Sequence, residues 1–158
     1  MSSQQSISEL LAAVQSGINQ PELLSEWLEI DHERVLAFAD ATNDHQWIHT
    51  DEIRAAESPY GGTIAHGFLT LSLISFFTAG ALQFDNTAAV LNYGLDRVRF
   101  LSPVRVGSRL RTSSRVIAAE EKTAGILIRL EVTIQIEGEE KPAAVAEQLV
   151  LAIAESTL

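Results

Sequence analysis

The second half of the chain alternates between apolar and polar residues with a period of two, which predicts β-strands. The alternation is clearest at 126–136, where every second residue is large and apolar. The residues expected on that buried face are Ile126, Ile128, Leu130, Val132, Ile134 and Ile136. Further strands are expected at 90–104, 108–117 and 143–153. The last of these is apolar on both faces, which is typical of a central strand or of a contact between subunits.

A different pattern precedes these strands. At 64–82, apolar residues fall on every side of a helical wheel, which predicts a helix that is roughly 27 Å long and buried nearly all round. A long central helix wrapped by a strongly curved antiparallel sheet is an α+β architecture, the hot-dog fold. One sheet covers only part of such a helix, so we expect a homodimer.

The same stretch is about long enough to span a membrane, which is a competing interpretation. It contains several polar side chains, and no Lys or Arg flanks it. The polar residues within it are His66, Thr70, Ser72, Ser75 and Thr78. We therefore expect the helix to lie in a protein interior and expect no membrane as partner.

Shorter elements are expected on either side of this helix. Those before it are a helix at 6–17, a short strand at 26–30, a helix at 32–42 and a turn of helix at 51–57. Asp31 is placed to cap the helix at 32–42, and residues 83–86 form the expected exit turn. The length of the chain predicts one domain over 1–158, with a helical N-terminal extension at about 1–30.

Composition restricts the chemistry. There are no cysteines, so a disulfide framework, a thiol nucleophile and a thiolate metal site are excluded. Residues 1–20 lack the basic region and the apolar core of a secretory signal, which makes a cytoplasmic location the default expectation. The net charge of −10 argues against nucleic acid as a partner.

The basic residues are unevenly distributed. Residues 97–115 contain six arginines and no acid. These arginines are Arg97, Arg99, Arg105, Arg109, Arg111 and Arg115. Such a stretch is typical of a site for a small anionic ligand, but a solvated strand face paired with acids elsewhere would have the same composition.

Asp44 and His49 are the strongest candidates for chemistry. A carboxylate and an imidazole five residues apart in an irregular loop can both bind one water, one accepting a proton while the other orients it. Trp47 and Ile48 lie between them and would keep the site dry. The alternative is a turn aspartate and a surface histidine without a catalytic role.

Two further groups of residues suggest binding. Gly67 lies in the first turn of the expected helix, where free N–H groups would stabilise a carbonyl oxygen that gains charge. His66 beside it is interpreted as a structural or loop-tethering residue rather than a second base. A metal site is an alternative for Asp44, His45, His49 and Asp51. Because the segment is not convincingly helical and Trp47-Ile48 suits a hydrated cation poorly, we expect no metal.

Two motifs resemble those of the MaoC-like dehydratases, which include the (R)-specific enoyl-CoA hydratases and relatives named nodulation protein N. Residues 44–51 read DHQWIHTD and residues 58–69 read SPYGGTIAHGFL. Residues 94–104, GLDRVRFLSPV, resemble the first long strand of the family. The resemblance covers roughly residues 30–155 and implies a hot-dog fold, usually a dimer.

The resemblance also implies a reaction, the reversible hydration of a trans-2-enoyl thioester to an (R)-3-hydroxyacyl thioester. Asp44 and His49 match the catalytic pair of the family, Gly67 matches the glycine whose N–H binds the thioester carbonyl, and Ser75 matches a serine that lines the site. Many members have Asn and Pro where this chain has Gln46 and Trp47, so we expect Trp47 to alter the pocket.

The substrate is expected to be an acyl thioester of coenzyme A or of acyl carrier protein, with no cofactor beyond the coenzyme A of the substrate itself. His66 is included among the expected substrate-binding residues, and Arg97 and Arg99 are expected to meet the phosphates. A hot-dog acyl-CoA thioesterase and a non-catalytic acyl-thioester binding protein remain alternatives. The acyl chain length, the carrier and the pathway do not follow from the sequence.

Overall fold

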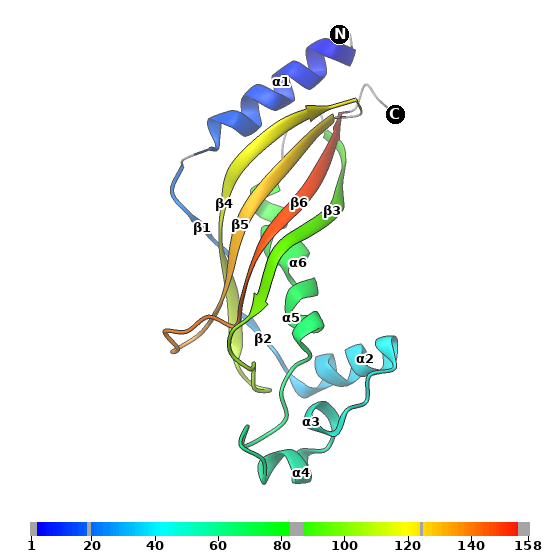
Figure 1. Ribbon diagram of the computed structural model, residues 1–158, viewed down its shortest axis with the longest axis vertical. Helices are drawn as coiled ribbons and strands as arrows, with labels where there is room; N and C mark the ends of the chain where they lie inside the picture. Colours follow the sequence, from blue (N-terminus) through cyan, green and yellow to red (C-terminus); the bar gives the residue numbers. More distant parts are fainter. Residues whose placement is uncertain (1–2, 19, 83–86, 124, 155–158) are drawn as a thin grey trace.

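The computed structural model describes residues 3–18, 20–82, 87–123 and 125–154. A six-stranded sheet curves along the central helix (Figure 1), in the order β1-β4-β5-β6-β3, with β2 also paired to β4. The strands are β1 (Leu23–Leu24), β2 (Leu28–Glu29), β3 (Thr87–Phe100), β4 (Arg109–Lys122), β5 (Gly125–Ile136) and β6 (Ala144–Ala154). All their pairings are antiparallel, so the expected α+β hot-dog architecture is confirmed.

The central helix differs from the single long helix that we expected. It consists of α5 (Gly67–Ser72), α6 (Ile74–Thr78) and the 3₁₀ turn η1 (Ala79–Leu82). The expected start at Ile64 is wrong, because Ile64 forms a β-bridge with Arg105 instead. The break falls at Leu73, whose N–H contacts both the Leu69 and the Leu71 carbonyls, so the turn tightens there while the chain keeps its direction.

The burial of this helix is one-sided within a single chain. Leu69, Ile74 and Phe77 face the sheet and are buried. Phe68 and Phe76 are 70% and 63% exposed, so the expectation of burial nearly all round is wrong for the isolated chain. Exposed apolar side chains that form a contiguous patch mark an interaction site.

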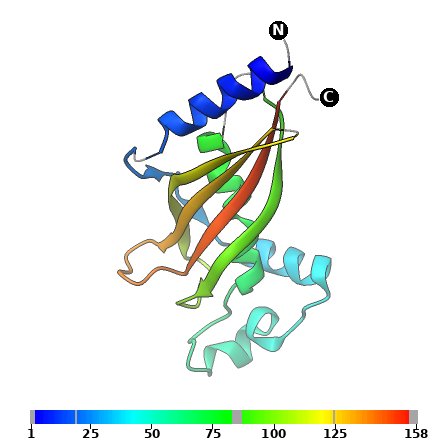
Figure 2. The ribbon, with the colours of Figure 1, turned by 45° about the horizontal axis from the view of Figure 1, so that its top comes forward.

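The core lies between the helix and the concave face of the sheet. The alternate residues of β5 from Ile126 to Ile136 are buried, as the period of two predicts. Helix α1 (Ser3–Ser16) lies across one end of the sheet (Figures 1 and 2) and contributes Ile7, Leu10 and Val14 to the same core. The N-terminal extension is therefore helical only in its first half, and its second half pairs with β4.

A group of short helices projects beyond the opposite end of the sheet (Figure 2). These are α2 (His32–Thr42), α3 (Trp47–Thr50) and α4 (Glu52–Ala56). Asp31 caps α2 as expected, because its carboxylate accepts the Arg34 N–H at 2.7 Å. The helix ends at Asn43 with a φ of 57°, a left-handed conformation that asparagine tolerates better than most residues. This turn directs the chain into the segment that carries Asp44.

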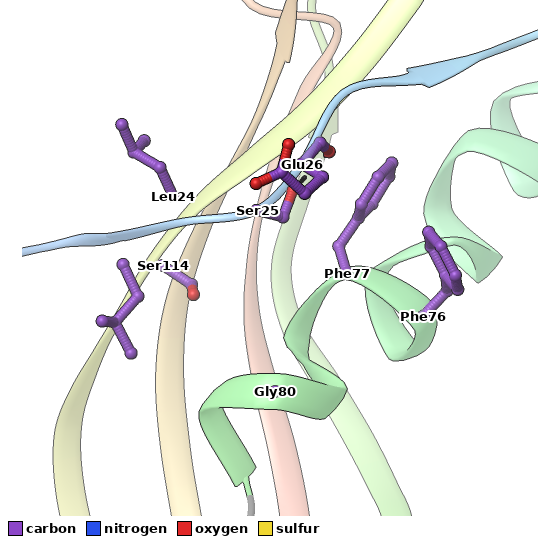
Figure 3. A pocket seen from close by; sticks show the side chains of 8 residues that line it. Leu24, Ser25, Glu26, Phe76, Phe77, Gly80 and Ser114 are labelled. Carbon is purple, nitrogen blue, oxygen red and sulfur yellow. Dashed lines mark hydrogen bonds between the residues drawn. The ribbon is translucent and has the colours of Figure 1, made fainter.

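A hollow of about 370 Å³ lies where strands β1 and β4 approach α6 (Figure 3). Its walls include Leu24, Phe76 and Phe77, with Glu26 as its only carboxylate among the described residues. It contains no expected catalytic residue.

Within the described part of the chain, no helix is long and apolar enough to cross a membrane. The exit turn expected at 83–86 lies outside the described residues.

Candidate active site

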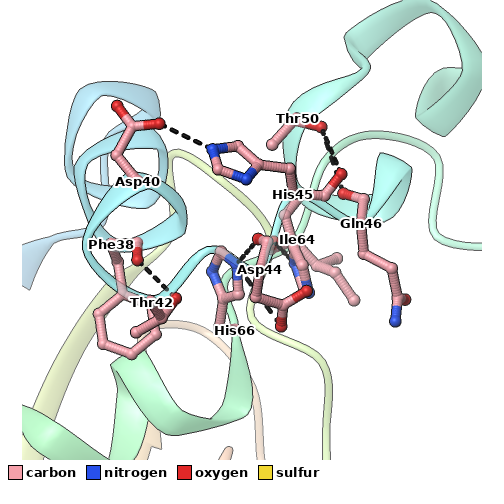
Figure 4. A network of polar contacts seen from close by, with 10 residues as sticks. Phe38, Asp40, Thr42, Asp44, His45, Gln46, Thr50, Ile64 and His66 are labelled. Atoms are coloured by element: carbon pink, nitrogen blue, oxygen red, sulfur yellow. Dashed lines mark hydrogen bonds and ion pairs between the residues drawn. The ribbon is translucent and has the colours of Figure 1, made fainter.

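The structure brings Asp44, His49 and His66 together from three separate segments. Asp44 follows α2, His49 lies in α3, and His66 precedes α5. One side-chain ligand atom from each lies within 4.8 Å of the others. Figure 4 shows the Asp44 side chain turned towards His66, with the Asp40–His45 pair further out. The two sequence motifs therefore converge on one site.

The imidazole of His49 is held in one tautomer. Its Nδ1–H donates to the Ile64 carbonyl at 2.7 Å, and because a carbonyl only accepts, Nε2 is left with the lone pair. Only 7% of His49 is exposed. This burial lowers the pKa of His49 below its usual value of 6.5, and His66 adds to the lowering, while Ile64 and Asp44 oppose it. His49 is therefore a neutral base near pH 7.

His66 lies behind this base rather than in front of it. Its Nε2–H donates to the Asp44 backbone carbonyl at 2.9 Å, so the ring ties the Asp44 segment to the start of α5. The ring stacks on His49, with centroids 3.7 Å apart, and contacts Phe38 on another side. Only 3% of His66 is exposed, and it does not line the adjacent hollow. The structure thus places it as the loop tether that the sequence suggested, and not beside the hollow where a substrate contact was also expected.

A hollow of about 470 Å³ adjoins this cluster. The residues that line it are Gln46, Ile48, His49, Tyr60, Ile64, Ala65, Gly67, Thr70, Phe100, Leu101, Ser102, Pro103, Val104 and Ala143. Gly67 is the first residue of α5, so its N–H precedes the intrahelical hydrogen bonds. A Cβ atom at Gly67 would meet the Phe100 ring at 3.2 Å, so glycine allows this close packing.

Two of the expected site residues lie elsewhere. The Ser75 hydroxyl donates to Asn92 Oδ1 at 3.2 Å and lines a different hollow, together with Tyr93 and Gln148. Trp47 does not line the hollow beside His49; its ring packs under the guanidinium of Arg54 at 4.2 Å. The spacing along the sequence did not predict either placement, because each depends on a partner from another segment.

The arginine stretch behaves largely as a paired strand surface. Arg97, at 82% side-chain exposure, forms an ion pair with Glu147 at 3.0 Å, and Arg109 and Arg115 pair with Glu137 and Glu131. For Arg97, Arg109 and Arg115, the structure therefore agrees with the alternative interpretation, a solvated strand surface whose arginines pair with acids. Arg99 donates to the Val98 carbonyl, and Arg105 donates to the Gly61 carbonyl at 2.6 Å. Within the described residues, neither has an acidic partner.

The metal alternative does not assemble as the sequence suggested. His45 Nε2 pairs with Asp40 at 2.8 Å, and the Asp51 carboxylate accepts the Arg54 N–H as the cap of α4. His66 takes the place of those two residues beside Asp44 and His49. Half of the Asp44 side chain is exposed, so the carboxylate is open to a water molecule as readily as to a cation.

Sequence reasoning missed the wall opposite the base. Phe100 packs against Gly67, and Ala143 reaches the same hollow from the turn before β6. The only feature of the sequence that could have indicated Phe100 as a site residue is its position in the segment that resembles the first long strand of the family. Ala143 carried no signal, since its position depends on the pairing of β5 with β6.

Comparison with known proteins identifies the relatives of the chain. The sequence pattern of the MaoC-like domain matches residues 13–136, most of the chain. The chain belongs to the MaoC-like dehydratase family. The matched range begins earlier and ends earlier than the resemblance at roughly 30–155 suggested. It extends back into α1, in keeping with the packing of that helix against the sheet.

Two relatives of this MaoC-like protein are similar along most of their length. "3-Hydroxyacyl-thioester dehydratase Z" of Mycobacterium tuberculosis is 42% identical over 151 residues, which cover 95% of this chain and 97% of the relative. "Nodulation protein N" of Rhizobium leguminosarum is 48% identical over 144 residues, covering 89% of each. An R-hydratase of Pseudomonas aeruginosa, 23% identical, has the same fold with a TM-score of 0.73, over 87% of this chain and 83% of the other.

Proposed function

We propose that this MaoC-like protein catalyses the reversible syn hydration of a trans-2-enoyl thioester to the (R)-3-hydroxyacyl thioester. One observation carries the proposal: the neutral Nε2 of His49 and the carboxylate of Asp44 share one site beside a hollow that Gly67 also lines. Two proton acceptors and an N–H donor are the groups that this reaction needs. The name of the mycobacterial relative, a 3-hydroxyacyl-thioester dehydratase, describes the reverse direction.

The proposed roles follow from the charge that develops. The water oxygen bonds to the β-carbon, the water loses one proton to the Asp44–His49 pair, and the α-carbon gains one proton, so that H₂O is added overall. Charge accumulates on the thioester oxygen, where the Gly67 N–H would donate a hydrogen bond. Because one pair handles both protons through one water, both additions fall on the same face of the alkene. No cofactor is needed beyond the carrier of the substrate.

The carrier is proposed to be coenzyme A or acyl carrier protein, both of which carry phosphate. Arg97 is a weaker candidate for phosphate contact than expected, because Glu147 already neutralises it. Arg99 and Arg105 lack an acidic partner within the described residues and flank the segment 100–104 that lines the hollow. We therefore propose that Arg99 contacts the phosphate, as the sequence suggested, and that Arg105 contacts it as well.

We also propose that the protein is a homodimer. The outer edge of the sheet is β3, which pairs only with β6 among the described strands. Leu91 and Tyr93 of β3 are 50% and 62% exposed, and Phe68 and Phe76 are exposed on the neighbouring helix. Light scattering after gel filtration should give twice the chain mass of 17.2 kDa, and Leu91→Glu should halve it. A wild-type mass of one chain at micromolar concentration would contradict this assembly.

The decisive experiment is the loss of enone absorbance when the protein meets crotonyl-CoA. Asp44→Asn should reduce the rate by about 10²–10⁴-fold, the usual contribution of a general base. Asp40→Asn is the matched control, since Asp40 lies four residues earlier and pairs with His45 on the surface. The chirality of the product, measured on the same sample, should be (R).

Three outcomes separate the functions. Hydration that Asp44→Asn abolishes and Asp40→Asn preserves supports the proposal. Full hydration by Asp44→Asn would overturn the assigned role of Asp44. Release of free thiol from acyl-CoA without loss of the enone would instead indicate a thioesterase.

A further inference from the structure

A buried threonine lines the hollow beside His49. Thr70 lies on α5, three residues after Gly67, and only 3% of it is exposed. Its backbone N–H donates to the His66 carbonyl at 3.1 Å, but among the described residues its hydroxyl group has no hydrogen-bond partner. A buried polar group without a partner destabilises the fold, so it calls for a role beyond folding.

Other hydroxyl groups in the helices bond to a carbonyl close by in the chain. Thr42 and Thr78 donate to the carbonyl four residues earlier, at 2.7 and 2.8 Å, and Ser72 donates to the carbonyl three residues earlier, at 2.8 Å. The His66 carbonyl lies four residues before Thr70, yet the Thr70 hydroxyl does not bond to it. This hydroxyl is therefore free for a group that enters the hollow.

Thr70 and Gly67 are neighbours on the surface of the helix. Residues three apart lie on the same side of a helix, and helical side chains lean towards the N-terminus. The two residues are separated by about 4.5 Å along the helix axis at 1.5 Å per residue, and this lean brings the Thr70 hydroxyl closer to the Gly67 N–H. Since a carbonyl oxygen has two lone pairs, one oxygen in the hollow can accept from both donors.

The burial of Thr70 distinguishes it from the other hydroxyl and amide side chains of the hollow. Gln46 and Tyr60 are exposed and Ser102 is only partly buried, so water reaches these three groups. A hydrogen bond is stronger where water is excluded, and a donor that is already held in place needs no reorganisation when charge develops. Thr70 therefore lies where a donor stabilises developing charge most effectively.

We infer that the Thr70 hydroxyl donates a second hydrogen bond to the thioester oxygen, beside the Gly67 N–H, and stabilises the enolate charge during hydration. This inference rests on the proposed function, because the thioester oxygen is taken to lie at Gly67. Thr70 keeps its hydrogen throughout, so the protons are still exchanged only among water, the α-carbon and the Asp44–His49 pair. The charge on the oxygen is larger in the transition state than in the substrate, so this hydrogen bond raises kcat more than it raises affinity.

The first test replaces the hydroxyl by a methyl group of similar size. Thr70→Val should lower kcat for crotonyl-CoA about 10²–10³-fold, the usual effect of removing one such donor, with a smaller change in KM. Thr70→Ser keeps a hydroxyl and should retain most of the rate. Thr70→Val should melt no lower than wild type, because the hydroxyl bonds to no described residue. A merely structural role would instead lower the melting temperature and leave kcat unchanged.

Thr112 of β4 provides a matched control. It is fully buried and its hydroxyl also lacks a partner among the described residues, but it does not line the hollow. Thr112→Val should therefore keep the wild-type kcat. Thr70→Ala offers a second way to remove the hydroxyl if Thr70→Val folds poorly. A wild-type kcat in either of these Thr70 variants would overturn the inference, and so would a Thr70→Ser variant as slow as Thr70→Val.

A bound thioester reports the contact without turnover. Butyryl-CoA is saturated and cannot be hydrated, and an isotope label at its carbonyl carbon identifies the C=O stretching band in infrared difference spectra. Hydrogen bonds lower the frequency of this band, so it should move to higher frequency in Thr70→Val and stay in place in Thr70→Ser and Thr112→Val. An unchanged band in Thr70→Val would overturn the contact, even if that variant were slow.

The proposed reaction can fail independently of this inference. A shift of the butyryl-CoA band in Thr70→Val, without hydration of any enoyl thioester by the wild-type protein, would remove the hydratase proposal and leave the contact of Thr70 with the thioester oxygen standing. Hydration of crotonyl-CoA at the same rate by wild type and Thr70→Val would do the opposite.

Discussion

His49 offers a sharp test, because its two ring nitrogens have separate tasks. Nδ1–H holds the Ile64 carbonyl at 2.7 Å, whereas Nε2 is the proposed base. An asparagine at this position places its amide nitrogen near the Nδ1 site and has nothing at Nε2. A glutamine reaches the Nε2 site and leaves the Ile64 carbonyl without its donor. The pair His49→Asn and His49→Gln therefore separates anchoring from catalysis.

The size of each effect follows from the surroundings of the ring. Both variants lose the Nε2 base, so each should hydrate crotonyl-CoA about 10²–10⁴-fold more slowly than wild type. Both also lose the stacking with His66, worth about 0.5–1.5 kcal/mol. His49→Gln additionally leaves the buried Ile64 carbonyl unpaired, at about 1–3 kcal/mol. His49→Gln should therefore melt at least about 2–4 °C below His49→Asn.

The assays are enone absorbance for the rate and calorimetry or circular dichroism for melting. A hydration rate for His49→Asn close to wild type would refute the role of Nε2, since that variant retains the anchoring hydrogen bond. Equal melting temperatures for the two variants would refute the importance of the Ile64 contact. The two conclusions stand or fall separately, because rate and stability are measured independently.

Three further predictions concern pH, the glycine at the helix start and a helix cap. Because burial lowers the pKa of His49, the neutral base persists below pH 6.5 and the acidic limb of kcat/KM should lie there. Since the unfolded chain takes up this proton first, calorimetry should also show stability falling as pH drops from about 6.5 towards the lowered pKa. Gly67→Ala should reduce kcat/KM about tenfold or more, because its Cβ meets the Phe100 ring at 3.2 Å, and adding Phe100→Ala should restore part of the rate. Asp31→Ala removes the acceptor of the Arg34 N–H at the start of α2 and should lower the free energy of unfolding by about 1 kcal/mol, measured by urea unfolding. Full activity of this variant at 25 °C would show that Asp31 has no role beyond capping the helix.

The local elements were predictable because each depends on neighbours in the sequence. The alternation at 126–136 requires one buried face whatever the rest of the chain does, and β5 has it. Asp31 caps α2 because a carboxylate can reach an N–H three residues on. Asp44, His49 and Gly67 were found through two motifs; in the structure His49 and Gly67 line one hollow, and Asp44 lies beside His49.

Only the tertiary structure decided the contacts between distant segments. Ser75 was expected to line the catalytic site but meets Asn92 of β3, and Arg97 was expected at phosphate but meets Glu147 of β6. His66 was interpreted as a loop tether and also included among the substrate-binding residues; it lies behind His49, where its hydrogen bond to Asp44 spans 22 residues.

The sequence by itself determined most of the elements, the family and the chemical groups of the site. The packing of α2, α3 and the start of α5 decided which of those groups face one another, and the single sheet left one side of the central helix uncovered. The physical reason is that periodicity and capping act within a few residues, whereas the direction of a side chain in the fold depends on which strands pair and in which register.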